Sequence, residues 1–240
     1  MSEAKVLTYE RKELRDPVAI IGFPTVGLVG SIVASFLARD LRLPVVAGIT
    51  SRDLPPYTLV QNGQPLPQVR IYAGPLPKAK RTMKRKDSVS EAPAQEQVKR
   101  PRVKPRDVII VTSEVVPKPE DTLDLAECIY RTVREMGATT VVCLEGIPLV
   151  PGTDLRMMGV ASSMEGAVLL EEKAGLTVMG DGVVRGITGV ILMLGMNDRA
   201  DVESILVPAN TQLPDPRSAA RLIEPLKAIL PGWTSTPSPC

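Results

Sequence analysis

A glycine-rich turn between an apolar strand and an apolar helix is the first segment whose residues could do chemistry. It runs from Gly22 to Gly30 as Gly-Phe-Pro-Thr-Val-Gly-Leu-Val-Gly. Free backbone N–H groups at the start of a helix can hold a phosphate group. The turn is not a P-loop, because Leu28 and Val29 stand where Lys and Ser/Thr are needed, and its first two glycines are too far apart for a dinucleotide fingerprint. Gly27 and Gly30 equally allow the helix to approach the sheet or another subunit closely, and the weak motif match favours packing.

Two carboxylates follow apolar segments that we predict to be buried strands, Glu114 after residues 107–112 and Glu145 after residues 139–144. Ligands of open α/β sheets bind at the carboxyl ends of the strands. If the two strands are neighbours, both acids face one crevice with the turn, where paired carboxylates suit acid–base catalysis or cation binding. The simpler interpretation is that each strand end meets water, where Glu is well solvated. The candidate ligand or interface crevice comprises Gly22, Pro24, Gly27, Gly30, Glu114 and Glu145.

The composition excludes several kinds of catalytic site. The chain contains no His, which removes Ser-His-Asp triads and His-based zinc sites. Cys128, Cys143 and Cys240 have no paired spacing, and the first two lie in apolar patterns typical of buried thiols. Ser113 and Glu114 do not form a nucleophile and its base, because adjacent strand residues point to opposite faces. We therefore predict no catalytic residues, no metal site and no cofactor.

Strand and helix patterns alternate along the chain and predict an α/β fold with a mostly parallel sheet flanked by helices, as is typical of continuous apolar strands. Predicted strands cover residues 18–21, 45–49, 107–112, 139–144, 176–179 and 183–185, and a loose hairpin joins 58–60 to 69–73 through Asn62-Gly63. Predicted helices cover residues 26–39, about 122–136, 163–174 and 216–230, the last with a kink at Pro225. Residues 187–194 are apolar throughout, so periodicity does not separate a buried helix from a strand.

Residues 17–38 are uncharged over a length that can cross a bilayer. Pro24 and three glycines interrupt this stretch, so a strand, a turn and a helix explain it better than a membrane helix. The polar start of the chain lacks the apolar stretch of a secretory signal. Together with the unpaired cysteines, these features predict a soluble, cytoplasmic protein that does not enter a membrane.

The segment 78–106 differs in composition from the rest of the chain. It contains eleven Lys and Arg residues, three acidic residues and hardly any large apolar ones. Such a segment cannot offset its ordering entropy, so we predict a basic flexible insertion. It is an arm for nucleic acid or an acidic partner, or merely a solvated loop, and its lack of aromatic residues for base stacking favours the loop. Around it we expect a single domain over residues 1–233, followed by a disordered tail at 234–240.

Several short motifs occur in the order found in one protein family. They are Gly22-Phe23-Pro24 with Val26-Gly27-Leu28-Val29-Gly30, then Leu54-Pro55-Pro56, Ser113-Glu114, Gly146-Ile147-Pro148, Gly186 with Gly189, and Asp215-Pro216 with Ala219-Ala220. The chain thus resembles the PAC2 family of proteasome assembly chaperones over nearly its whole length, leaving out residues 78–106 and the two ends. The resemblance implies a fold similar to that of purine nucleoside phosphorylases, homo-oligomers as in archaeal members, and a role in assembling proteasome α-subunits without catalysis.

From the resemblance we expect a protein-binding assembly factor that holds proteasome α-subunits during ring assembly and associates with itself. The alternative is a phosphorylase- or hydrolase-like enzyme that acts on a nucleoside-like small molecule at the Gly22–Gly30 turn, with Glu114 and Glu145 nearby. Two features depart from the family pattern. The chain ends in Ser238-Pro239-Cys240, whereas some proteasome-binding proteins end in a hydrophobic residue, tyrosine and any residue, and the basic insertion is additional.

Overall fold

The computed structural model describes residues 4–52, 54–76, 106–149, 152, 156–230 and 233. The predicted basic insertion, apart from Arg106, and the predicted tail at 234–240 lie outside these residues. Their character therefore stays a prediction, as does the single domain over residues 1–233.

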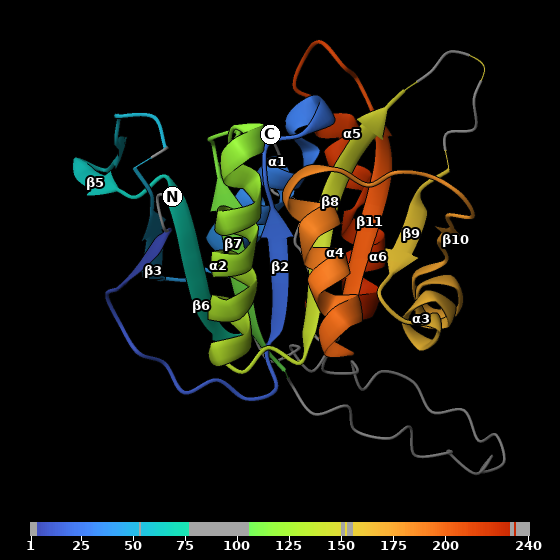
Figure 1. The fold of residues 1–240 in the computed structure, drawn as a ribbon, viewed down its shortest axis with the longest axis horizontal. Coiled ribbons are helices and arrows are strands. Elements are labelled where there is room, and N and C mark those ends of the chain that lie inside the picture. Colours follow the sequence, from blue (N-terminus) through green and yellow to red (C-terminus); the bar gives the residue numbers. More distant parts are fainter. Residues whose placement is uncertain are drawn as a thin grey trace, which may run out of the picture.

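A nine-stranded mixed sheet forms the centre of the described part of the chain (Figure 1). In spatial order its strands are β1 (Lys5–Thr8), β3 (Val45–Thr50), β6 (Val69–Pro75), β7 (Asp107–Ser113), β2 (Val18–Gly22), β8 (Thr140–Pro148), β11 (Asp201–Ala209), β9 (Met158–Ala161) and β10 (Thr177–Val178). The central strands β7, β2, β8 and β11 are parallel to one another. Antiparallel pairing adds β6, β3 and β1 on one side and β9 on the other. The predicted α/β class is confirmed, but the sheet is parallel at its centre with antiparallel strands on both sides, and not mostly parallel as predicted.

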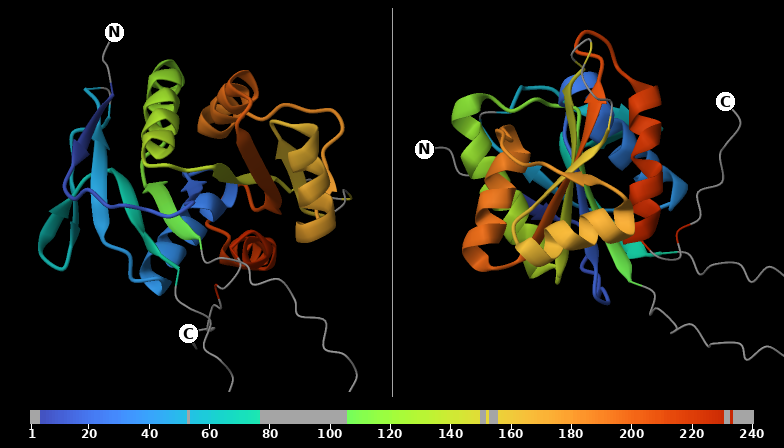
Figure 2. Two further views of the ribbon diagram at one scale, coloured as in Figure 1. Left: turned by 90° about the horizontal axis from the view of Figure 1, so that it is seen from below. Right: turned by 90° about the vertical axis from the view of Figure 1, so that its right-hand side faces the viewer.

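Helices cover both faces of this sheet, as the right-hand view of Figure 2 shows. On one face lie α2 (Thr122–Glu135), which follows the short helix η2 (Pro119–Asp121), and α4 (Gly186–Asp198). On the other lie η1 (Val26–Leu28), α1 (Val29–Asp40), α5 (Pro216–Arg221) and α6 (Ile223–Ile229). The remaining helix, α3 (Met164–Ala174), packs at the edge made by β9 and β10.

Adjacent residues of the central strands enter two different cores. In β7, Ile109 belongs to the core under α2 and α4, which also contains Ile191 of α4. The next residue, Ile110, belongs to the core on the opposite face, which also contains Leu37 of α1 and Leu226 of α6. Side chains alternate between the faces of a strand, so a strand covered on both faces must be apolar at every position. This is why the runs predicted from the sequence as buried strands are continuous.

The Asn62-Gly63 turn was predicted correctly, but its second strand was not. Asn62 and Gly63 both have positive φ angles, of 52° and 75°, as a two-residue hairpin turn requires. They join β4 (Leu59–Gln61) to β5 (Gln64–Leu66) in a small separate sheet. Residues 69–73, which we expected in this hairpin, belong to β6 of the main sheet. The turn is too short to reach a strand that begins six residues later.

The second half differs from the prediction at several places. Residues 183–185 form no strand, and the ambiguous segment 187–194 lies inside α4. The final helix is broken at Leu222 into α5 and α6, which places Pro225 in the first turn of α6. Proline is tolerated there, because the first turn of a helix needs no backbone N–H from it.

The uncharged stretch 17–38 is divided between β2, η1 and α1. Within the described ranges, every helix is too short or too polar to traverse a lipid bilayer.

Candidate functional site

The Gly22–Gly30 turn carries the chain from β2 into α1 through two consecutive left-handed residues. Gly27 has a φ angle of 65° and Leu28 one of 54°. Glycine adopts this conformation without cost, whereas a leucine pays about 1 kcal/mol for it. The α-helix consequently begins at Val29, three residues later than the helix predicted over residues 26–39.

Backbone contacts fill the space around this turn. A methyl group added at Gly22 would overlap the carbonyl oxygen of Gly30, and one at Gly30 would overlap that of Leu144 in β8. A methyl group at Gly146 in β8 would likewise overlap the carbonyl oxygen of Val26. The hydroxyl of Thr25 accepts a hydrogen bond of 3.1 Å from the Gly146 N–H. The start of α1 is therefore packed directly on β8, as the packing interpretation of the glycines requires.

Pro24 and Gly27 of the turn also face protein. Pro24 is buried. The carbonyl oxygen of Gly27 accepts a hydrogen bond of 2.8 Å from the backbone N–H of Asp215, the residue that caps α5. The Asp215 carboxylate in turn accepts from the Ser218 N–H at 2.9 Å, and backbone hydrogen bonds, that of Ser218 first, hold the pKa of Asp215 below its usual value. Two motifs far apart in the sequence thus meet at one end of the sheet.

Glu114 and Glu145 do not share a crevice. Strand β2 lies between β7 and β8, so the strands that carry the two acids are not neighbours. Glu145 binds Thr188 of α4, whereas Glu114 binds Arg70 and lies on the face covered by α1. Glu145 moreover lies within β8 rather than after its end. The conditional expectation of one paired-carboxylate site fails because the two side chains point to opposite faces of the sheet.

Glu145 is a largely buried carboxyl group without a cationic partner among the described residues. Its Oε2 accepts a hydrogen bond of 2.7 Å from the hydroxyl of Thr188, in the first turn of α4. Burial raises the pKa of Glu145 to about 7, although hydrogen bonds with Thr188 and Thr25 lower it in part. The nearby thiol of Cys143 is fully buried, which raises its pKa too. This pair therefore offers a carboxyl group that loses its proton only near neutral pH and a thiol that stays protonated.

Glu114 forms an ion pair with Arg70 of β6 that sequence reasoning missed. The guanidinium donates two hydrogen bonds to the carboxylate, one of 2.7 Å from Nη1 to Oε2 and one from Nη2 to Oε1. Its Nε donates to the Tyr72 hydroxyl at 3.1 Å. The Arg70 side chain is only 5% exposed and that of Glu114 is 44% exposed. One signal could have revealed Arg70, because a charged residue between Val69 and Ile71 interrupts an otherwise apolar strand.

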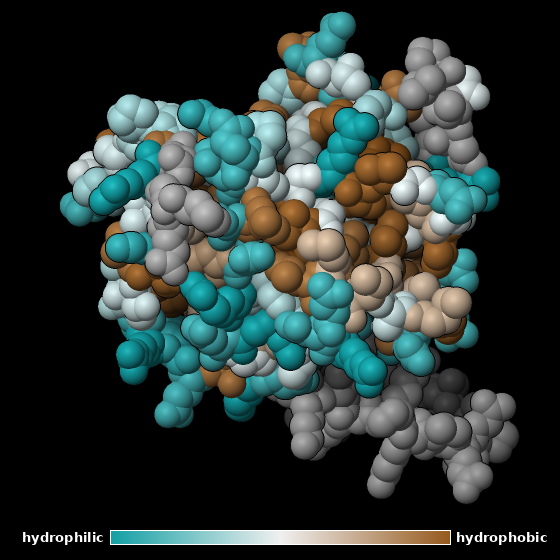
Figure 3. Space-filling view, viewed as in Figure 1, coloured by the Kyte–Doolittle hydropathy of each residue, from teal (hydrophilic) through white to brown (hydrophobic). Residues whose placement is uncertain are grey.

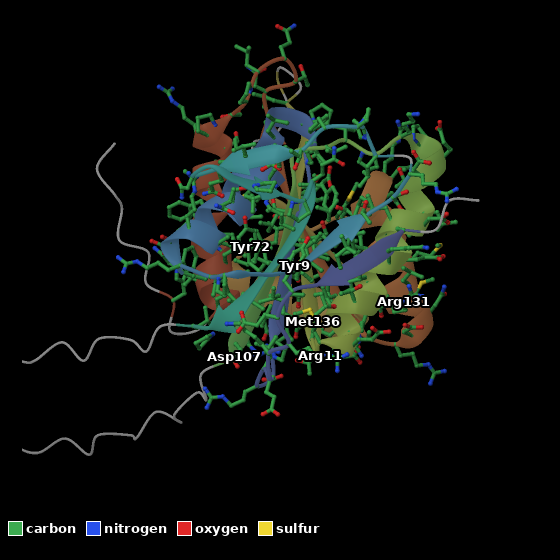
Figure 4. All side chains as sticks on the ribbon, turned by 90° about the vertical axis from the view of Figure 1, so that its left-hand side faces the viewer. Tyr9, Arg11, Tyr72, Asp107, Arg131 and Met136 are labelled. Carbon is green, nitrogen blue, oxygen red and sulfur yellow. The ribbon has the colours of Figure 1, made fainter. Side chains whose placement is uncertain are left out.

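A groove of about 680 Å³, here called the α1 groove, runs past this ion pair between α1 and the β4–β5 hairpin. Arg70, Tyr72 and Glu114 line it from the sheet side, and Arg39 and Arg42 line it at the end of α1. Figure 4 looks onto this edge of the sheet, with Tyr72 on the side of α1 and Met136 on the side of α2. On the α2 side, Arg11 and Met136 line a separate cavity of about 420 Å³.

A third cavity, of about 250 Å³, lies at the amino ends of β8 and β11. Asp201 and Glu203 line it together with Arg106 and Lys173. Burial and the neighbouring Asp201 raise the pKa of Glu203 to about 7, against the opposing effect of Lys173 and Arg106. No three Cys, Asp or Glu residues of the described chain come together in a way that could hold a metal ion.

The outer face of α4 is apolar. Met193 and Met196 are 47% and 59% exposed, and Val190 is partly exposed one turn earlier. In Figure 3, hydrophobic side chains gather over the area that α4 occupies in Figure 1. Because α4 is apolar on its buried face as well, it is a helix without a polar side along most of its length. Such a helix is typical of an element that is covered on both sides.

The sequence matches the profile of the PAC2 family over residues 19–237. It is 28% identical over 218 residues to an uncharacterized protein of Methanocaldococcus jannaschii, which covers 90% of this chain and 76% of that one. The resemblance inferred from the ordered motifs is thereby confirmed.

The solved structures with a similar fold include two from one archaeon. One is Pyrococcus furiosus PbaA, described as an archaeal homolog of proteasome-assembly chaperone, with a TM-score of 0.77, 23% identity and coverage of 98% of this chain and 84% of that one. The other is Pyrococcus furiosus PbaB, described as an archaeal proteasome activator, with a TM-score of 0.74, 21% identity and coverage of 98% and 92%.

The packing of the turn on β8 predicts that Gly30→Ala destabilises the protein. The new methyl group would overlap the Leu144 carbonyl oxygen, and overpacking of this kind costs about 1–3 kcal/mol. The free energy of unfolding from urea titration measures the effect. The control is Gly180→Ala, because Gly180 has nothing within 4 Å of the added methyl group. Equal stability of the two variants would show that the turn is not packed as described.

The raised pKa of Glu145 predicts that stability falls as the pH rises. The folded protein binds this proton more tightly than the unfolded chain, whose Glu has the ordinary value of 4.5. The stabilisation is complete below that value and is lost as the pH rises through about 7, which amounts to on the order of 3 kcal/mol. Glu203 contributes in the same direction. Urea titrations between about pH 5 and 8 measure this slope.

Glu145→Gln keeps the shape of the neutral carboxyl group and should make the slope shallower. The matched control is Glu120→Gln, since Glu120 is exposed and its replacement should leave the wild-type slope. An unchanged slope in Glu145→Gln would contradict the assignment of a buried, neutral carboxyl group at this position.

Proposed function

Because the chain belongs to the PAC2 family, we propose that it is a protein-binding assembly factor that holds proteasome α-subunits during ring assembly. Family membership over residues 19–237 is the observation that carries this proposal. It is supported by the fold shared with an archaeal homolog of proteasome-assembly chaperone and with an archaeal proteasome activator. We further propose that the protein acts in the cytoplasm and associates with itself, as the resemblance implied.

The outer face of α4 is the surface that we assign to the α-subunit. Val190, Met193 and Met196 offer apolar area that becomes favourable to bury on association. Methionine side chains are flexible and adapt to a partner surface. Such adaptability suits a partner that is bound during assembly and then released.

We propose that this function requires no catalysis. The separation of Glu114 from Glu145 supports this, as does the backbone packing that fills the Gly22–Gly30 turn. The nucleoside-directed phosphorylase or hydrolase considered as the alternative would need these groups in one place. A purine nucleoside phosphorylase-like architecture remains part of the proposal, supported by the parallel strands β7, β2, β8 and β11 between helical layers. A nucleic-acid contact through residues 78–106 remains a prediction.

The proposal predicts that the purified protein captures proteasome α-subunits at micromolar concentration, with or without nucleotide. Replacing Met193 and Met196 together by Lys should weaken capture about tenfold or more, because charged ammonium groups would then have to be buried at the contact. A pull-down with titrated α-subunit measures this. The control is Val60→Lys, which changes a valine that is 68% exposed on β4, away from α4.

Two outcomes would contradict the proposal. Absence of capture by the wild-type protein would remove the assembly function. Loss of self-association in the Met193 and Met196 variant, measured as mass by light scattering, would show that the α4 face joins copies of this chain instead of holding the α-subunit.

A further inference from the structure

The α1 groove lies where the sheet lacks a helix. On this face α1 packs over β7, β2 and β8, and α5 packs over β11. Next to α1, the residues of β3 and β6 that point to this face include Val45, Arg70 and Tyr72, and they form the floor of the groove. The β4–β5 hairpin supplies its other wall through Gln61, Asn62 and Gln64, and Leu66. The groove is therefore formed by the arrangement of α1, the sheet and the β4–β5 hairpin, and not merely by the positions of a few side chains.

Its charge is positive. Three arginines and one glutamate line it, and the single carboxylate, Glu114, is already engaged by Arg70. Among the described residues, the Arg39 guanidinium donates only to the carbonyl oxygen of Ser35, at 3.3 Å. The guanidinium of Arg42 has no hydrogen-bond or ion-pair partner within the described part of the chain, although its backbone N–H donates to the Arg39 carbonyl oxygen at 3.0 Å. The two exposed guanidinium groups at the end of α1 therefore remain available to carboxylates of a bound molecule.

The rest of the lining suits a polypeptide. Gln61, Asn62 and Gln64 carry amide side chains that can both donate to and accept from a peptide backbone. Leu43, Val45 and Leu66 add apolar area to the groove, beside these amides and the arginines. Small-molecule sites are mostly apolar and enclose their ligand, whereas this groove is walled by exposed amide and guanidinium groups. Its volume of about 680 Å³ is enough for a segment of several residues.

We propose that the α1 groove binds an acidic peptide segment of a protein partner. Carboxylates of the segment pair with Arg39 and Arg42, while its backbone lies against the amides of the hairpin. The Arg70–Glu114 pair forms a rigid polar floor, since the bidentate contact fixes both side chains. This site lies on the opposite face of the sheet from α4, so it goes beyond the proposed function and does not depend on it.

Fluorescence anisotropy with a labelled eight-residue peptide of alternating glutamate and valine tests this proposal. The comparison peptide replaces every glutamate by glutamine. The glutamate peptide should bind the intact protein at least about tenfold more tightly than the glutamine peptide, and its affinity should fall with added salt, because contacts of exposed charges are screened.

The decisive variant is Arg39→Gln combined with Arg42→Gln, which should weaken binding of the glutamate peptide about tenfold. Its matched control is Arg131→Gln combined with Arg199→Gln, which removes the same charge from exposed sites outside the groove. The two pairs of arginines also match in backbone conformation. Arg42 and Arg199 each come just after a helix, and each has a left-handed φ angle, of 51° and 52° respectively. The control should stay within about twofold of the wild type.

Three results would overturn the proposal. They are equal affinity for the two peptides, an equal loss in the two double variants, and no binding of the glutamate peptide at about 1 mM. Thermal unfolding of both variants verifies that each is folded. The peptide experiment tests the α1 groove, whereas capture of α-subunits tests the α4 face. A negative result in the peptide experiment therefore leaves the proposed assembly function untouched.

Discussion

Direct backbone contact between the Gly22–Gly30 turn and the carboxyl end of β8 is the constraint on which both faces of the molecule depend. Gly30 lies against the Leu144 carbonyl and Gly146 against that of Val26, so the start of α1 has one position relative to the sheet. That position sets the wall of the α1 groove. The same contact fixes the end of β8, and with it Glu145, under the first turn of α4.

The two surfaces to which we assign partners are separated by the sheet. The α4 face is apolar and uncharged along most of the helix, whereas the α1 groove is polar and basic. Apolar area supplies affinity without much selectivity, and charge supplies selectivity and faster association. The two surfaces have no residue in common. The α4 face and the α1 groove can therefore be occupied at the same time, and binding at one surface need not weaken binding at the other.

Local patterns predicted most central elements, because β2, β7 and β8 are covered on both faces and must be apolar throughout. Strand β11 was missed because it contains the charged Glu203 and a proline, Pro208, both of which are unusual in a buried strand. The proline is tolerated because it lies beyond the four residues of β11 that pair with β9. The Arg70–Glu114 pair joins residues 44 positions apart, and only the strand register brings them together. Motif order identified the family correctly, but it could not show that β2 separates the two glutamates.

The register of β6 and β7 has a consequence for how this sheet can vary. Pro75 and Asp107 are direct partners on these antiparallel strands, and Asp107 is held in place by a hydrogen bond of 2.7 Å from the Arg15 N–H to its carboxylate. The long stretch between them thus connects two points that an ordinary tight turn would join. The entropic cost of closing a loop grows slowly with its length. Insertions, deletions and substitutions in this connection are therefore compatible with an unchanged sheet on either side of it.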